Sequence, residues 1–460
     1  MSLRPDDRAG HTGLPPDVVI VDQPHRLDDV IDAIARAKRV ALDTEFIREG
    51  RYFPFVCLAQ LAINDKIYVV DPLKILDILP LWKALLRKDL TLIVHSGFQD
   101  LQIIYEATGS LPSRIIDVQV AAGFAGFGYP MAYHSLVSGV LGKTLAKSAT
   151  YTRWERRPLT PEQLAYAADD VRHLFPISDA LIERFDSLPA IVDGEEVRIE
   201  RLAWSEQEIR RQVAETRFVF DPDQELIRLG KYARRLDGHE LTCLRELLLW
   251  RERTARATDR PLTSVAKDET LVDMARKRPG HPGDLRAFRG LQINRNKDAQ
   301  RELLSVIGRA ATLPPTSAPK APPRNELPPA TSAVVDLLYA GVRVRATHAQ
   351  VAPELVAAPK DVLAWLIAFG KKRGRELRDA VEQAARPSST GSASIPVLAR
   401  GWRADFVGPI LFKLLSGELR LRPYMPDGGI WPELAFVLRV PKSGEHAAAP
   451  ASQAPSRSDE

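Results

Sequence analysis

The sequence predicts a mixed α/β domain in about the first 190 residues, followed by helical domains. Three short apolar segments follow one another between Arg39 and Val70 with connections too short for helices, which is typical of an antiparallel meander. Further apolar segments, residues 92–94 and 115–116, then alternate with helix-like stretches, the pattern of strands added in parallel to one sheet. Beyond about Asp221 the strand pattern ends. We therefore expect a mixed sheet with helices packed against it, and helices thereafter.

The three meander strands are expected at residues 39–42, 55–61 and 67–70, with Pro54 and Asn64-Asp65 in the turns between them. In the helical part, residues 241–256 carry an apolar stripe of Leu244, Leu247, Leu248 and Trp250, which predicts a long amphipathic helix. Shorter helices are expected around residues 271–274, 285 and 303–306.

A chain of 460 residues is too long for one hydrophobic core and indicates two to four domains. The first twenty residues have no basic start followed by an apolar stretch, and no segment of about eighteen apolar residues occurs, so we expect neither a signal peptide nor a membrane span. The two cysteines, Cys57 and Cys243, exclude a disulfide framework or a cysteine zinc site and fit a reducing cytoplasm. We expect a cytoplasmic monomer that does not contact membranes.

Composition divides the chain further. Residues 313–330 contain seven prolines, which indicates an extended, semi-rigid linker. The expected divisions are a disordered N-terminus (1–17), the α/β domain (18–190), a connecting helical segment (191–230), a helical domain (231–312), the proline-rich linker (313–330), a further helical domain (331–440) and a disordered tail (441–460).

Positive charge is concentrated in the first helical domain. Residues 231–310 hold 18 Lys and Arg against 11 Asp and Glu, whereas the net charge of the whole chain is +5. A basic module indicates a polyanionic partner. A solvated arginine-rich surface explains the same surplus, and charge alone does not separate the two.

The first chemical signal is Asp43-Thr44-Glu45, at the end of the first meander strand. Residues two apart on a strand point to the same side, so these two carboxylates project together. Hard oxygen ligands of this kind suit Mg²⁺ or Mn²⁺. Taken alone, an Asp-x-Glu triplet occurs by chance in most proteins of this size.

The second signal is Asp100, in the first turns of a helix after an apolar strand and a Gly97-containing turn. This is where α/β folds build sites, although an acid there also complements a helix dipole. The third is a helix beginning at Pro161, with Thr160 and Gln163 as a capping box. It places Tyr166 and Asp170 four residues apart on one face and turns Asp169 away.

In this order, the three signals match the exonuclease motifs of the DEDD superfamily, and the tyrosine indicates the DEDDy branch. Residues 18–188 closely resemble the ribonuclease D family. The resemblance is carried by residues 42–46, 51–54, 70–72 and 159–171, and by Lys147-Ser148 with Trp154.

The resemblance implies an RNase H-like (DnaQ-like) exonuclease fold and a metal-dependent 3′→5′ exoribonuclease that releases 5′-mononucleotides. Asp43, Glu45, Asp100 and Asp170 would bind two divalent ions, Mg²⁺ or Mn²⁺, whose positive charge the four carboxylates offset. In the family pattern Asp43 bridges the ions, Glu45 and Asp170 hold the one that activates water, and Asp100 serves the other partly through water. Tyr166 would orient the water or accept its proton.

Other polar residues near these motifs are given different roles. His95 is expected to be structural rather than a base, because Tyr166 occupies the third-motif position. Asp71 and Asp117, each ending an apolar strand, are expected to be turn and cap residues. Lys147, Ser148 and Trp154 resemble a substrate-side family motif and are candidates for nucleic-acid contacts, with a packed Trp154 as the alternative.

Residues 231–312 resemble the HRDC domain that follows the nuclease in this family. The likeness is carried by Leu244, Leu247, Trp250-Arg251, Ala255-Arg256, residues 259–261, Leu271, Met274-Ala275 and Pro279. It implies nucleic-acid binding, with Arg251, Arg253, Arg256, Arg276, Lys277 and Arg278 as candidate phosphate contacts. Residues 400–403, 408 and 414–417 resemble a degenerate second HRDC-like unit more loosely.

Three functions follow from the sequence. The first is an exoribonuclease trimming the 3′ ends of transfer RNA precursors, the family's characteristic substrate. The others are a DNA 3′→5′ exonuclease and a catalytically silent RNA-binding relative. Presence of all five expected catalytic residues argues against the silent relative, whereas the sequence does not separate RNA from DNA.

Overall fold

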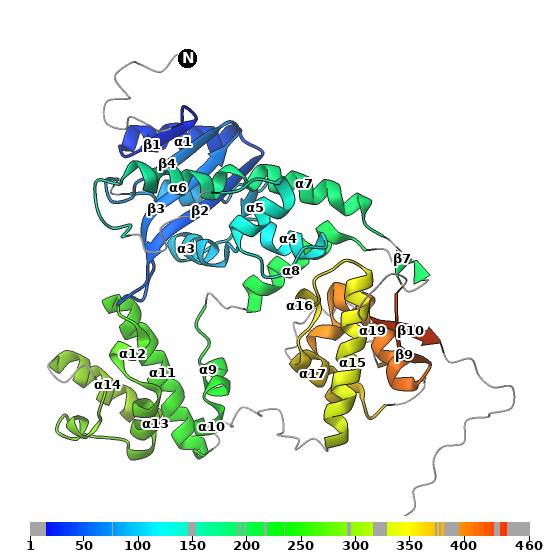
Figure 1. Cartoon of the computed structure of the whole chain (residues 1–460). Coiled ribbons are helices and arrows are strands. Elements are labelled where there is room, and N and C mark those ends of the chain that lie inside the picture. The colour runs from blue at the N-terminus through cyan, green and yellow to red at the C-terminus, as the bar shows by residue number, and fades with distance from the viewer. Residues whose placement is uncertain are drawn as a thin grey trace, which may run out of the picture. The chain divides into compact units, whose positions relative to one another are not determined.

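A computed structural model describes residues 15–438, except 76, 146–152, 190, 193–194, 197–198, 216–218, 234, 292–295, 316–328, 373–374, 377–378, 381–394 and 427–432. It contains two compact units (Figure 1). The first combines the described residues up to Leu188 with those in Glu200–Leu327. The second combines Pro189–Ile199 with those in Pro328–Glu460. The residues expected to form the disordered tail, nearly all of the N-terminal segment and most of the proline-rich linker lie outside the described residues.

The first unit contains a six-stranded sheet in the order β1-β4-β3-β2-β5-β6. Its strands are β1 (Val18–Val21), β2 (Arg39–Ile47), β3 (Phe55–Ile63), β4 (Lys66–Val70), β5 (Thr91–Val94) and β6 (Arg114–Asp117). Strands β2, β3 and β4 pair antiparallel, while β1, β5 and β6 each pair parallel to their neighbours. The predicted mixed sheet with a central meander is confirmed. Strand β1, four residues beside Pro15 and Pro16, is too short to have stood out from the sequence.

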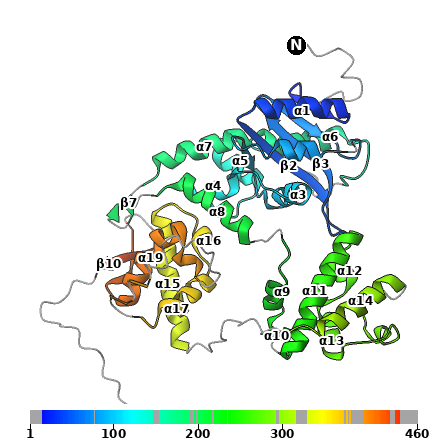
Figure 2. The ribbon, with the colours of Figure 1, turned by 180° about the vertical axis from the view of Figure 1, so that it is seen from behind.

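Helices cover both sides of this sheet, as Figures 1 and 2 show from opposite directions. They are α1 (Pro24–Arg36), α2 (Leu79–Ala84), α3 (Phe98–Thr108), α4 (Val118–Phe124), α5 (Tyr133–Leu141), α6 (Pro161–Arg172), α7 (Leu174–Ser187) and α8 (Arg201–Glu215). Each side of the sheet has its own apolar cluster. Helices α1, α2 and α3 share one cluster with Leu42 of β2, and α4 to α7 share the other with Ala41. Successive strand residues point to opposite faces. The odd-numbered residues of β2, beginning with Ala41, therefore face α6.

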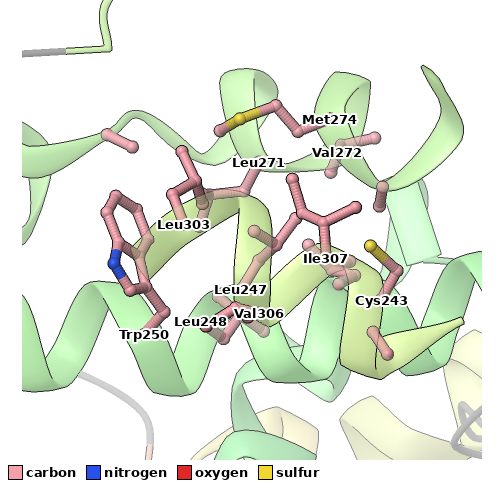
Figure 3. Close-up of a cluster of buried hydrophobic side chains, with 14 of the residues drawn as sticks. Cys243, Leu247, Leu248, Trp250, Leu271, Val272, Met274, Leu303, Val306 and Ile307 are labelled. Atoms are coloured by element: carbon pink, nitrogen blue, oxygen red, sulfur yellow. The ribbon is translucent and has the colours of Figure 1, made fainter. Parts of the chain in front are cut away.

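The remainder of the first unit is helical. Its elements are α9 (Pro222–Arg228), α10 (Gly230–Ala233), α11 (Gly238–Thr258), α12 (Leu262–Val265), α13 (Asp268–Lys277), the 3₁₀ turn η2 (Asp284–Ala287) and α14 (Lys297–Ala310). Figure 3 shows Trp250 and Leu247 of α11, Met274 of α13 and Ile307 of α14 meeting in one core. The long helix predicted at residues 241–256 is confirmed.

The second unit contains α15 (Pro329–His348), α16 (Pro353–Val356), α17 (Pro359–Phe369), η3 (Val397–Ala399) and α19 (Gly401–Ser416). It also contains two hairpins, β7 (Ile191–Val192) with β8 (Glu195–Glu196) and β9 (Leu419–Tyr424) with β10 (Glu433–Leu438). The expectation of helices alone beyond residue 190 is therefore wrong at these two places. Strand β9 alternates buried Leu419 with exposed Arg420, but its arginines and Pro423 hid the strand pattern.

Candidate active site

Strand β2 directs two carboxylates toward helix α6. Asp43 and Glu45 follow Ala41 on the same face, and that face is packed by α6. A bulge between Glu45 and Phe46 interrupts the pairing with β3, and bulges of this kind re-aim side chains beside active sites.

Helix α6 supplies the third-motif residues. The predicted capping box is confirmed, since Thr160 accepts from the Gln163 amide N–H and the Gln163 side chain accepts from the Thr160 amide N–H. Both Tyr166 and Asp170 lie on this helix and, one turn apart, occupy one face. Asp169 pairs with Arg172 at 3.0 Å instead, which agrees with its predicted orientation away from the site.

Asp100 is positioned by a tight turn between β5 and α3. The Asp117 carboxylate accepts from the amide N–H groups of Ser96 and Gly97 at 3.0 Å, and caps α4 through Gln119. The predicted cap role of Asp117 is confirmed. A side chain at position 97 would place Cβ 2.4 Å from Val94 Cγ2, so only glycine fits this turn.

The three motifs converge. One carboxylate oxygen from each of Asp43, Glu45 and Asp170 lies within 4.8 Å of the other two. Asp100 is buried beside them and accepts a hydrogen bond from the Thr44 hydroxyl. Its charge acts on both Asp43 and Glu45.

Burial and mutual repulsion disfavour the ionised carboxylates. Burial, followed by the charge of Asp100, raises the pKa of Glu45 to about 7. Burial and the charge of Glu45 raise the pKa of Asp170 to about 8. Burial raises the pKa of Asp100 to about 6 against the hydrogen bond from Thr44, and raises the pKa of Asp43 well above its ordinary value. Acids held this way need either protons or a cation between them.

The donor set fits a divalent cation. Carboxylate oxygens are the ligands that Mg²⁺ and Mn²⁺ prefer. Gln60 is the register partner of Asp43 on β3. It is fully buried, and neither polar atom of its amide has a hydrogen-bond partner among the described residues. A polar group left in this state beside acids indicates a site completed by a bound species.

Other polar residues near the site have structural contacts. His95 Nε2 lies 2.9 Å from the carbonyl oxygen of Met131, and its ring centroid is 5.4 Å from that of Tyr133. Asp71 accepts from the Leu73 amide N–H at 3.0 Å, which confirms the predicted turn role. The two contacts of His95 agree with a structural role for its side chain.

The substrate-side motif is described only in part. Trp154 is buried among apolar residues, and its ring centroid is 6.1 Å from that of Tyr166. This packing favours the structural alternative for Trp154 over a contact with a base. Lys147 and Ser148 lie outside the described residues.

The structure corrects one of the candidate phosphate contacts on α11 and shows the partners of another. Arg251 is 2% exposed and pairs with Asp268 at 2.7 Å, so no phosphate can reach its guanidinium in this structure. Arg256 is held by Glu106 at 2.9 Å and by the Tyr52 hydroxyl at 3.0 Å. Arg251 therefore adds to the arginine count of the domain without adding an accessible phosphate site, whereas the Arg256 side chain is 40% exposed and its role in binding phosphate stays a prediction.

The other four candidates, Arg253, Arg276, Lys277 and Arg278, are exposed. Lys277 lies over the Phe288 ring at 5.6 Å and Arg278 is 3.9 Å from Asp237. Their role in binding nucleic acid stays a prediction.

Arg256 is part of a polar contact between α11 and the β2–β3 connection. Asp259, which ends α11 in a left-handed conformation (φ +47°), accepts from the amide N–H groups of Tyr52 at 3.1 Å and Phe53 at 2.9 Å. It also pairs with Arg51 at 2.7 Å. The guanidinium of Arg256 lies 5.2 Å from the centre of the Tyr52 ring.

Sequence reasoning missed Thr44, Gln60 and Arg157. Thr44 stands between the two acids of the first motif, and Gln60 is the polar interruption of an apolar strand; both signals were visible. Arg157 binds buried Asp71 through two contacts of 2.6 Å. Its partner lies 86 residues away, and no sequence spacing indicated the pair.

Comparisons with known proteins agree with this geometry. Residues 18–186 match the family model described as 3′-5′ exonuclease, and residues 240–307 match that of the HRDC domain. The chain is 33% identical over 390 residues to ribonuclease D of Zymomonas mobilis, covering 84% of this chain and 91% of the relative. It is 32% identical over 377 residues to ribonuclease D of Pseudomonas paraeruginosa, covering 82% and 92%.

A similar solved structure is that of Escherichia coli RNase D, described as an exoribonuclease involved in structured RNA processing. The TM-score is 0.67 at 27% identity, covering 86% of this chain and 98% of the other. Among the residues that the structure describes, no helix combines the length and hydropathy that crossing a membrane requires.

Proposed function

The chain belongs to the ribonuclease D family, and on this basis we propose that it is a metal-dependent 3′→5′ exoribonuclease that releases 5′-mononucleotides and trims transfer RNA precursors. The observation that carries the proposal is the convergence of Asp43, Glu45 and Asp170 within 4.8 Å. Asp100 lies beside them and Tyr166 one helical turn from Asp170. The similar solved structure, described as acting in structured RNA processing, supports RNA as the polymer.

Two ions, Mg²⁺ or Mn²⁺, would supply positive charge that acidifies a water molecule and stabilises the departing 3′-oxygen. Asp43, which feels the charges of all three other acids, is suited to contact both ions. Glu45 and Asp170 would hold one of them and Asp100 would serve the other. The hydrogen bond from Thr44 fixes the Asp100 carboxylate.

The Tyr166 hydroxyl would supply the site with a hydrogen-bond donor. A phenolic oxygen can both donate and accept, whereas ionised carboxylates only accept. Tyr166 is 37% exposed, so a water between its hydroxyl and the carboxylates can exchange with solvent. We assign Tyr166 to orienting the attacking water, or accepting its proton once that water has been acidified.

One experiment distinguishes the proposed function from a DNA exonuclease and from a silent RNA-binding protein. The wild-type chain is incubated with Mg²⁺ and matched RNA and DNA oligonucleotides, labelled at the 3′ or the 5′ end. We expect stepwise shortening of RNA from the 3′ end, release of 5′-mononucleotides and complete inhibition by EDTA. Preferred cleavage of DNA would replace the proposal with a DNA exonuclease, and binding without cleavage would replace it with a silent RNA-binding protein.

Metal affinity is expected to rise with pH. Glu45 and Asp170, with pKa values of about 7 and about 8, hold protons below pH 6 and must lose them before a cation binds. Affinity for Mn²⁺, measured by titration calorimetry, should therefore increase by about tenfold or more from pH 6 to pH 8. Calorimetry in buffers of different ionisation enthalpy should show proton release. An affinity independent of pH would contradict the predicted protonation of the site.

The exposed basic residues of α13 provide a test of RNA binding by the HRDC domain. Changing Arg276 and Lys277 to Gln should weaken binding of a structured precursor and lower its log–log salt slope by about one to two. A short single strand should be affected less. The control is Arg36→Gln with Lys38→Gln, which removes two exposed charges near α1. An unchanged salt slope in the α13 variant would remove these residues from the binding surface.

A further inference from the structure

Beyond the carboxylates and Tyr166, the structure shows a buried ion pair connected to both the Tyr166 side and the Glu45 side of the site. Arg157 lies in the segment that leads into α6, and Asp71 follows the last residue of β4. The Arg157 Nε and one terminal nitrogen each bind an Asp71 oxygen at 2.6 Å. Asp71 is 4% exposed, so little solvent competes for this pair.

The same guanidinium makes two contacts that reach toward the catalytic residues. One nitrogen donates to the carbonyl oxygen of Trp154 at 2.7 Å, and Trp154 packs beside the Tyr166 ring. Another donates to the carbonyl oxygen of Cys57 at 2.8 Å. Cys57 is the β3 residue that the register with β2 skips, between Leu58 opposite Glu45 and Val56 opposite Phe46.

We propose that the Arg157–Asp71 pair is a positioning device that sets the Tyr166 hydroxyl relative to Glu45. This inference rests on the proposed function and adds a residue to its machinery. Arg157 is bound through all three guanidinium nitrogens, so the planar group cannot rotate without losing several hydrogen bonds. Lysine offers one nitrogen in place of this fork and cannot hold these acceptors in one plane.

If the Arg157–Asp71 pair had a purely structural role, the expected effect of breaking it would differ. Breaking a buried ion pair destabilises a domain whatever its distance from the site, and such a loss lowers the folded fraction without depending on Tyr166. A pair that acts through Tyr166 lowers turnover of the folded enzyme, and it does so only while the hydroxyl is present. Reaction rates fall steeply when a reacting group is misplaced by about 1 Å.

The test is a double-mutant cycle on the full chain. Variants Arg157→Lys, Tyr166→Phe and the double variant are compared with wild type in steady-state and single-turnover cleavage of a short RNA at saturating Mg²⁺. We expect Arg157→Lys to lower kcat by about tenfold with KM changed by less than about twofold, and to cost less than about twofold more in the Phe background. Rates are normalised to the folded fraction measured by circular dichroism.

Arg39→Lys is the matched control, because Arg39 forms a two-point ion pair with Asp179 on the surface of the same domain. It should leave kcat unchanged. If Arg157→Lys does not fold, Asp71→Asn and Trp154→Phe carry the same cycle, the second without touching the ion pair.

Equal losses in the Tyr and Phe backgrounds would overturn the proposal and leave the pair a purely structural role. An unchanged kcat in a folded Arg157→Lys would also overturn it. Failure of the proposed function is distinct, since wild type would then not shorten RNA at all. If Tyr166→Phe alone were fully active, the assigned role of Tyr166 would fail, and the proposal with it.

Discussion

Replacing any one of the four acids by its amide is expected to lower kcat by at least about 10³-fold, or about 4 kcal/mol of transition-state stabilisation. Asp43→Asn removes the carboxylate that interacts with all the others, so the ions would lose their shared ligand. Glu45→Gln, Asp100→Asn and Asp170→Asn would each remove a proposed ligand of one ion. The measurement is single-turnover cleavage of RNA over a range of Mg²⁺ concentrations.

These variants should be more stable than wild type when no metal is present. Raised pKa values mean that ionising the acids costs stability as pH rises from their unfolded values through about 8. The amides cannot ionise, so in EDTA at pH 8 each variant should melt at a higher temperature than wild type. Added Mg²⁺ should stabilise wild type far more than Asp43→Asn.

Asp169→Asn is the control for this series. Its carboxylate adjoins Asp170 in sequence but pairs with Arg172, so turnover should stay near normal. Near-normal turnover in one of the four amide variants would show that the replaced acid is not an essential ligand. A large loss in Asp169→Asn would place the site on the other face of α6.

Tyr166→Phe is expected to lower kcat by about 10²-fold while metal binding persists. The change removes one hydroxyl and keeps the ring beside Trp154, so the free energy of unfolding should fall by no more than about 1–2 kcal/mol. Single-turnover rates and Mn²⁺ calorimetry on the same preparation separate the two effects.

Tyr133→Phe is a close control for Tyr166. Its hydroxyl lies within reach of the charges of Asp170 and Asp43, but it donates to the carbonyl oxygen of Asp169 at 2.9 Å and so stabilises α6. We expect some loss of stability and little loss of turnover. Full activity of Tyr166→Phe would show that water is positioned by another group.

Local patterns predicted the site's elements because its geometry is largely local. The two-residue spacing of Asp43 and Glu45 and the four-residue spacing of Tyr166 and Asp170 determine which side chains share a face. The capping box determined where α6 begins, and so which face of the helix these two residues occupy. Family resemblance then connected motifs that are 127 positions apart at most, from Asp43 to Asp170.

What the sequence could not supply is the partner of each charge. Arg251 and Arg253 count equally when charges are summed from the sequence. In the structure, however, Arg251 is buried against Asp268 and Arg253 is exposed. Counting charges therefore overestimated the basic surface. The Arg157–Asp71 pair was hidden for the same reason, since tertiary packing alone brings the two residues together.

The contact between α11 and the β2–β3 connection limits how freely these modules can be exchanged. Asp259 binds two consecutive backbone N–H groups, of Tyr52 and Phe53, besides the Arg51 side chain, so its recognition depends on the length and path of that connection as well as on a side chain. A helical module grafted in place of residues 240–307 would need an acidic residue in a left-handed conformation at the end of its first long helix. It would also need an arginine three positions earlier, in the place of Arg256. The nuclease and its first helical domain are therefore matched parts, and a chimera would have to inherit both sides of this joint together.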